Sequence, residues 1–121
     1  MIIWLASYPR SGNSLSQVFL KGSFGLQTYQ AHPPLAVAHF AEYLDAESLS
    51  EAAAASQTYF VKTHDPPPDR AKAIYIVRDG RSAVISYFHF LQHFASEHKF
   101  SVEDVIMGEC CNCLGKQTWS L

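Results

Sequence analysis

A continuous apolar run near the start of the chain, Ile2 to Ala6, most constrains what this sequence can fold into. Tyr8 and Pro9 follow the run and stop it. A short apolar run without polar alternation predicts a strand that is buried on both faces. Strands of this kind belong to parallel sheets, so the run points to an α/β fold.

A helix is expected directly after this first strand. It would lie between the loop Pro9 to Asn13 and the glycines Gly22 and Gly25, which are residues that end helices. The apolar residues that recur at helical spacing in this segment are Leu15, Val18 and Phe19.

Helices are also expected in the middle of the chain, where they would cover a face of the sheet. One begins at Pro34, a residue suited to the first helical turn. Its apolar residues at helical spacing are Leu35, Ala38, Ala41 and Leu44. The segment Ser48 to Glu51 resembles a capping box that leads into a second helix over Ala52 to Ala55.

Two further strands and two further helices complete the pattern. A second buried strand is expected at Thr58 to Lys62, because the prolines Pro66 to Pro68 force a loop near His64. The third strand is expected at Ala73 to Val77. A helix should follow it, with an apolar stripe formed by Val84, Ile85, Phe88 and Leu91. A capping box at Ser101 to Asp104 predicts a short helix that ends near Gly108.

This alternation predicts a three-layer α/β/α fold with a central parallel sheet. At 121 residues the chain has the size of one domain, so we expect a single domain over residues 1–121. Folds of this class bind ligands at the carboxyl ends of their strands. Polar clusters follow each expected strand, at Pro9 to Ser14, Lys62 to His64 and Arg78 to Arg81, and should therefore meet at one edge of the sheet.

Charge and composition exclude several classes of protein. Nine Lys and Arg against eleven Asp and Glu give a net charge of −2, which argues against a nucleic-acid partner and against an anionic membrane surface. Any anion site must be local. The opening run is too short to span a bilayer and no basic segment precedes it, so we expect a cytoplasmic protein without a signal peptide or membrane span.

The cysteines Cys110, Cys111 and Cys113 are odd in number and fall within four positions, which does not suit a disulfide framework. Reduced thiols are the simpler interpretation. Cys110 and Cys113 form one C-x-x-C pair, but zinc needs four ligands and the sequence has no second pair. We therefore expect no metal site.

The first polar cluster, Arg10-Ser11-Gly12-Asn13-Ser14, lies where a strand turns into a helix N-terminus. Unpaired main-chain N–H groups and the positive end of the helix dipole suit such a turn to an anion. An ordinary strand–helix turn, in which Gly12 bends the chain and Asn13 or Ser14 caps the helix, explains the same residues equally well. The nucleotide-binding pattern G-x-x-x-x-G-K-[ST] is absent, which disfavours metal-dependent phosphoryl transfer.

The second and third clusters supply a base and further cations. Lys62 and His64 lie two positions apart at a strand end, which puts both side chains on one side of the chain. Arg78 can bind a phosphate with its forked guanidinium, and Ser86 adds a hydroxyl donor eight residues later. Taken alone, Arg78 could equally be a salt-bridging residue and Ser86 a tolerated helix serine.

Taken together, these three clusters resemble the sulfotransferases that use 3′-phosphoadenosine 5′-phosphosulfate (PAPS), in motif order and in spacing, from residue 2 to about residue 108. The resemblance implies a sulfotransferase version of the P-loop-like fold and a loop Arg10 to Ser14 that holds the 5′-phosphosulfate. It implies that Arg78 and Ser86 bind the 3′-phosphate, that His64 is the catalytic base, and that Lys62 contacts the transferring group. Arg10 and Lys62 would stabilise the charge that develops during transfer to an acceptor hydroxyl or amine, without a metal.

The chain departs from the family pattern at several points. Arg10 stands where many cytosolic members have Lys, and Ser14 replaces a commoner Thr. The later Gly- and basic-residue segment of the family has no counterpart before Leu121, so we expect an incomplete copy of the domain whose activity alone is in question.

Two other functions stay open at this point. One is a nucleoside or metabolite kinase with an irregular phosphate loop, and the other is a non-catalytic protein that binds the nucleotide product. The acceptor, whether small molecule or glycan, and the oligomeric state do not follow from the sequence.

Overall fold

The computed structural model describes residues 1–33, 41–94 and 100–107, and its centre is a parallel sheet. Five strands form it in the order β3-β2-β4-β1-β5, and every pairing among the described strands is parallel. The bounds of these strands are Ile2–Ser7 (β1), Thr28–Gln30 (β2), Glu42–Tyr43 (β3), Tyr59–Thr63 (β4) and Lys72–Ile76 (β5). The expected parallel α/β architecture is confirmed.

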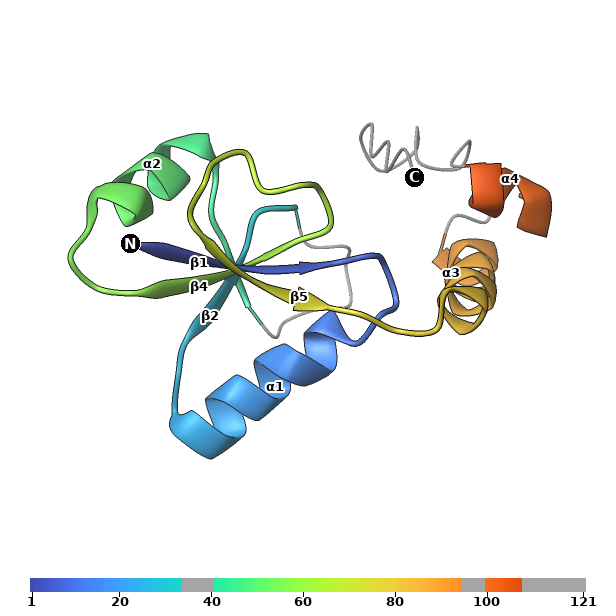
Figure 1. Cartoon of the computed structure of the whole chain (residues 1–121), viewed down its shortest axis with the longest axis horizontal. Coiled ribbons are helices and arrows are strands. Elements are labelled where there is room, and N and C mark those ends of the chain that lie inside the picture. Colours follow the sequence, from blue (N-terminus) through green and yellow to red (C-terminus); the bar gives the residue numbers. More distant parts are fainter. Residues whose placement is uncertain (34–40, 95–99, 108–121) are drawn as a thin grey trace.

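Helices flank the sheet on both sides, as Figure 1 shows for α1 (Asn13–Phe24) and α2 (Ala46–Ala54). Residue alternation along β1 places Trp4 on the side of α2, where it packs with Val61 and Ala52 in one core cluster. Leu5 and its register partner Lys62 lie on the opposite side of the sheet. β1 is therefore a central strand covered on both faces, as its apolar run predicts.

The remaining helices, α3 (Gly80–Phe94) and α4 (Val102–Met107), pack against each other beyond the carboxyl ends of the strands (Figure 1). Tyr87, Leu91 and Val105 form the buried centre of this second cluster. The predicted capping box of α4 is confirmed, because the main-chain N–H of Asp104 donates to Ser101 Oγ at 3.1 Å and the N–H of Ser101 donates to Asp104 Oδ2 at 2.7 Å.

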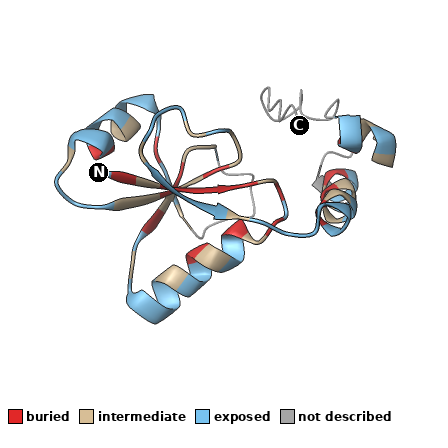
Figure 2. Ribbon diagram, viewed as in Figure 1, coloured by how far each residue is buried: buried red, intermediate tan, exposed pale blue. Residues whose placement is uncertain are grey.

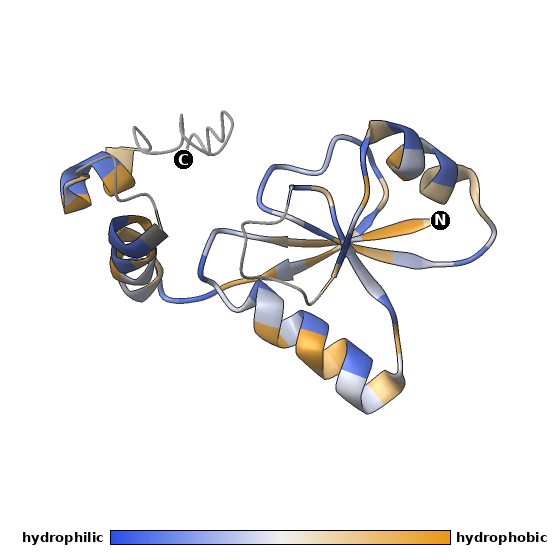
Figure 3. Cartoon of the chain, turned by 180° about the vertical axis from the view of Figure 1, so that it is seen from behind, coloured by the Kyte–Doolittle hydropathy of each residue, from blue (hydrophilic) through white to orange (hydrophobic). Residues whose placement is uncertain are grey.

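The apolar residues of α1 do not form its buried face. Its buried residues are Asn13 and Gln17, whereas Leu15 and Phe19 are 73% and 56% exposed. The amide of Asn13 donates to the Leu5 carbonyl and that of Gln17 to the Tyr29 carbonyl, so main-chain acceptors on β1 and β2 fix the rotation of the helix. The apolar stripe consequently faces outward, and Figure 3 shows apolar residues along this helix.

The helix expected from Pro34 to Leu44 is wrong over residues 41–44, the part of this segment that the structure describes. Residues 34–40, and with them Leu35 and Ala38, lie outside the described residues, but Glu42–Tyr43 is a strand that pairs with β2. The Leu44 N–H donates to the Gln30 carbonyl at 2.9 Å, and the Leu44 side chain is buried in the core. Pairing with the sheet outweighs a helical apolar spacing here. The short strand β2 was not predicted.

Two smaller corrections concern helix details. α2 begins earlier than expected, because Asp45 and not Ser48 is its cap and accepts the Ser48 N–H at 2.9 Å. In α3 the fully buried stripe is Ala83, Tyr87 and Leu91, while Ile85 is exposed. α3 packs against α4 and not against the sheet, so a different face is turned inward.

β5 is an edge strand of the described sheet and is exposed. Ile74 and Tyr75 are 48% and 59% exposed, whereas the neighbouring central strand β1 is buried over most of its length. Figure 2 shows the contrast between the two strands. The expected third strand thus exists, and it neighbours β1 as β4 does on the other side.

Candidate functional site

The carboxyl ends of three neighbouring strands, β4, β1 and β5, lie at one edge of the sheet. The loop after β1 runs from Tyr8 to Gly12, His64 follows β4, and Arg78 follows β5 by two residues. His64 contacts Ser7 at the end of β1, and Arg78 contacts the loop that follows β1. The structure therefore brings the sequence-predicted site residues to one edge and does not scatter them.

The loop after β1 has an unusual backbone that opens the N-terminus of α1. Arg10 and Gly12 have positive φ angles of 64° and 106°, and the Ser11 N–H donates to the Tyr8 carbonyl at 3.2 Å. Gly12 is the residue that caps α1, and it offers no side-chain hydrogen bond to the first turn. The main-chain N–H groups of that turn are thus left for an anion. Within this segment Ser11 is buried, and Ser14 in the first turn of α1 is exposed.

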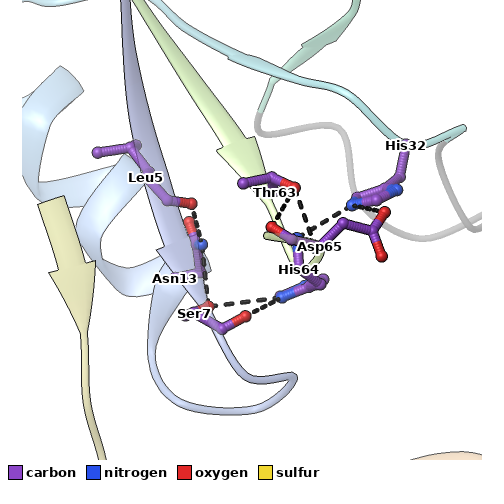
Figure 4. Close-up of polar contacts among 7 residues, drawn as sticks. All are labelled: Leu5, Ser7, Asn13, His32, Thr63, His64 and Asp65. Carbon is purple, nitrogen blue, oxygen red and sulfur yellow. Dashed lines mark hydrogen bonds and ion pairs between the residues drawn. The ribbon is translucent and has the colours of Figure 1, made fainter. Parts of the chain in front are cut away.

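Asn13 holds the loop to the sheet. Its Nδ2 donates to the Leu5 carbonyl at 2.8 Å and to Ser7 Oγ at 3.0 Å, and Asn13 is 3% exposed (Figure 4). Its Oδ1 is buried with no partner among the described residues. The Asn13 side chain therefore bonds to β1 and does not cap the helix, and Asn13 presents only its main-chain N–H at the start of α1.

Arg10 links the loop to α3. Its Nε donates to Ser86 Oγ at 3.3 Å, and its guanidinium carbon lies 5.3 Å from the centroid of the Phe90 ring, a cation–π distance. Arg78 Nη1 donates to the Arg10 carbonyl at 3.0 Å. Two residues predicted to act as a pair, Arg78 and Ser86, thus both contact Arg10.

His64 lies against the end of β1. Its Nδ1 is 2.9 Å from the Ser7 carbonyl and 3.4 Å from Ser7 Oγ (Figure 4). A carbonyl only accepts, so Nδ1 carries the proton and the lone pair is on Nε2. Burial lowers the pKa of His64 to about 4, with Lys62 and His32 adding to the effect and the Ser7 carbonyl opposing it. The ring is neutral at physiological pH and has the protonation state of a general base.

Lys62 lies in β4, two residues before His64, on the face of the sheet that α1 covers. Burial, and secondarily the charge of Arg10, lower its pKa. Among the described residues, no carboxylate lies within 4.0 Å of Arg10, Lys62 or Arg78. Within the described part of the chain, the edge therefore carries three cations without an ion-pair partner, beside an open helix N-terminus.

Sequence reasoning missed two residues at this edge, Ser7 and His32. Ser7 is fully buried as the last residue of β1, and its carbonyl orients His64. His32 is not singled out in the sequence analysis, and its ring stacks on that of His64, with centroids 5.8 Å apart and planes at 9°. The signal that could have found it is register, because Gln30 pairs with Lys62 and both histidines lie two residues further on.

The described residues contain no group of three or more His, Cys, Asp or Glu arranged to hold a metal ion. Cys110, Cys111 and Cys113 lie outside the described residues. Over the part of the chain that the structure covers, none of the helices combines the length and apolar character needed to cross a bilayer.

Comparison with known proteins gives one family. The family model of the sulfotransferase domain matches residues 2–117. Neither the curated proteins nor the solved structures contain a significant match.

Proposed function

Because the chain belongs to the sulfotransferase domain family, we propose that it transfers a sulfuryl group from PAPS to a hydroxyl or amine of a small-molecule or glycan acceptor. The observation that carries this proposal is the convergence of Arg10, Lys62 and Arg78 at the open N-terminus of α1, beside a neutral histidine. A doubly phosphorylated nucleotide carrying sulfate is an anion that such a site would attract.

The residues around the loop fit the two phosphate groups of the donor. The main-chain N–H groups from Ser11 to Ser14, with the Ser14 hydroxyl and Arg10, would hold the 5′-phosphosulfate, since that end of α1 has no side-chain cap. Arg78 and Ser86 would bind the 3′-phosphate. Each of them makes one hydrogen bond to Arg10, so the exposed Arg78 guanidinium has further donors to offer.

His64 would act as the general base. The bound donor supplies an activated sulfuryl group, and His64 Nε2 takes the proton from the acceptor oxygen or nitrogen as that atom bonds to sulfur. The bond from sulfur to the bridging oxygen breaks, and its electron pair stays with the 5′-phosphate. The Ser7 carbonyl keeps the proton on Nδ1, so Nε2 is the nitrogen that accepts.

Lys62 and Arg10 would stabilise the negative charge that grows on the sulfuryl and bridging oxygens. Lys62 suits this role because it is a partly buried cation without an acidic partner within 4.0 Å among the described residues. A positive charge held in place before reaction needs little reorganisation when the transition state forms.

Calorimetric binding of adenosine 3′,5′-bisphosphate tests the donor site. We expect Arg78→Ala and Ser86→Ala each to weaken binding about tenfold or more, as loss of a charge-assisted hydrogen bond does. Arg81→Ala is the matched control, since Arg81 lies three residues further along, is exposed and pairs with Asp79 at 3.7 Å. No binding by the wild-type chain, or equal loss in all three variants, contradicts the proposed site.

Sulfuryl transfer itself is the second test. Lys62→Ala and His64→Ala should each lower turnover about a hundredfold or more, whereas Lys72→Ala on the exposed β5 should not. Magnesium-dependent ATP turnover with indifference to PAPS would instead favour the kinase alternative. Nucleotide binding without any turnover would favour a binding protein.

A further inference from the structure

His32 follows β2, the strand next to β4 on the side away from β1. The parallel register of these two strands continues beyond Gln30 and Lys62, because the Ala31 N–H donates to the Lys62 carbonyl at 3.0 Å. His32 and His64 are therefore neighbours across the end of the sheet. Figure 4 shows Ser7 and His32 on two sides of His64.

The main chain of His64 is held by the ring of His32. The His64 N–H donates to His32 Nε2 at 3.0 Å. A ring nitrogen that accepts a hydrogen bond carries no proton, so His32 is neutral with its proton on Nδ1. Asp65 Oδ2 lies 3.9 Å from the same Nε2, which is too far for a hydrogen bond to the neutral ring.

The charged groups around His32 leave it in this neutral state. Burial lowers the pKa of His32, Asp65 opposes this effect, and Lys62 adds to it. Protonation of His32 Nε2 would break the hydrogen bond that it accepts from the His64 N–H, and the ring would pair with Asp65 instead. The neutral ring is thus the form that keeps His64 in its observed place.

His64 needs such a support because it stands in a turn. Thr63 Oγ1 donates to the Asp65 carbonyl at 3.1 Å and accepts the Asp65 N–H at 3.0 Å, which takes both Asp65 main-chain groups. Pro66 to Pro68 follow and have no N–H to donate. Outside this turn, His64 contacts Ser7 on one side and His32 on the other.

We propose that His32 is a positioning residue for the base: it accepts the His64 main-chain N–H and stacks on the His64 ring, and so keeps Nε2 directed at the acceptor. This rests on the proposed role of His64. In this role His32 does not contact the substrate. Its loss should therefore lower turnover and leave the affinity for the nucleotide unchanged.

Three substitutions separate the two contacts. His32→Gln keeps an acceptor at the position of Nε2 and loses the ring, His32→Phe keeps the stacking ring and loses the acceptor, and His32→Ala loses both. We expect turnover to fall about tenfold to a hundredfold in His32→Ala, as displacement of a catalytic group by about 1 Å does. Each single-contact variant should lie between His32→Ala and wild type. His89→Ala, on the exposed face of α3, is the control and should match wild type.

A double-mutant cycle tells positioning from a general structural role. In the His64→Ala background, His32→Ala should cause no further loss of turnover, because His32 acts through His64. Affinity for adenosine 3′,5′-bisphosphate should equal that of wild type in every His32 variant. A loss that adds fully to that of His64→Ala, or nucleotide binding that weakens in parallel with turnover, overturns the proposal.

NMR titration of the His64 ring keeps the test independent of turnover. The ring should titrate with a pKa of about 4 in the wild type and closer to its ordinary value in His32→Ala, because the ring becomes more exposed to water. If the wild type transfers no sulfuryl group but this shift occurs, the proposed function fails and the positioning stands. An unchanged titration in His32→Ala overturns the positioning.

Discussion

Lowering the pH from 7 to 5 should destabilise the folded chain through His64. The pKa of His64 is about 4 in the folded chain, against about 6.5 for an unperturbed histidine. The unfolded chain therefore binds this proton more tightly than the folded chain. Stability is greatest above the unfolded pKa and falls as the pH drops from about 6.5 towards 4, below which both states are protonated.

The size of the loss follows from the two pKa values. The linkage relation gives a decrease of about 2 kcal/mol in the free energy of unfolding between pH 7 and pH 5 for this imidazole alone. Because the ring is half-buried and partly screened by solvent, we expect between about 1 and 2 kcal/mol. The pKa of His32 is lowered as well, so this second ring acts in the same direction.

Equilibrium urea unfolding at the two pH values measures the effect, with fluorescence of the buried Trp4 as the probe. His64→Gln is the matched control, since it keeps a polar side chain that does not titrate. Its free energy of unfolding should depend less on pH than that of the wild type, by between about 1 and 2 kcal/mol over this interval. Equal pH dependence in the two proteins would refute the argument, and so would a wild type that is more stable at pH 5.

Further predictions concern the loop and its support. Asn13→Ala should lower the free energy of unfolding by about 1 to 3 kcal/mol in urea unfolding, because it removes the buried hydrogen bonds from Nδ2 to the Leu5 carbonyl and to Ser7 Oγ; an unchanged midpoint would contradict this. Gly12→Ala should lower the free energy of unfolding by about 1 to 2 kcal/mol, because Gly12 has a φ of 106°. Gly22→Ala inside α1 should raise the free energy of unfolding, because the added methyl meets no atom within 4 Å and alanine favours the helix. Effects of the same sign in the two variants would show the reasoning to be wrong. Lys62→Met should raise the urea midpoint while turnover collapses, since folding disfavours the charged form of this lysine; a lower midpoint would argue against that.

The sequence predicts those parts of the fold that depend on local patterns. The apolar run of β1, the prolines after β4 and the capping box of α4 each act within a few residues, and each prediction agrees with the structure. The edge of the sheet where Arg10, His64 and Arg78 meet also follows, because parallel strands end on the same side.

Features that depend on distant partners could not be predicted in this way. The outward apolar face of α1 results from hydrogen bonds of Asn13 and Gln17 to two different strands. β3 is extended because it pairs with β2, although its apolar spacing suits a helix. The stacking of His32 on His64 requires the β2–β4 register, and the sequence pattern of β2 is too short to reveal a strand.

The bare side of β5 has a practical consequence for handling this protein. The outer peptide groups of Lys72–Ile76 have no neighbouring strand in the described chain, and Ile74, Tyr75 and Val77 are exposed beside them. An edge strand without a partner among the described residues promotes strand-to-strand aggregation as concentration rises, and Lys72 is the one charged residue within β5 that opposes it. Purification should therefore favour dilute solutions and low salt, where repulsion between lysines on approaching edges is screened least.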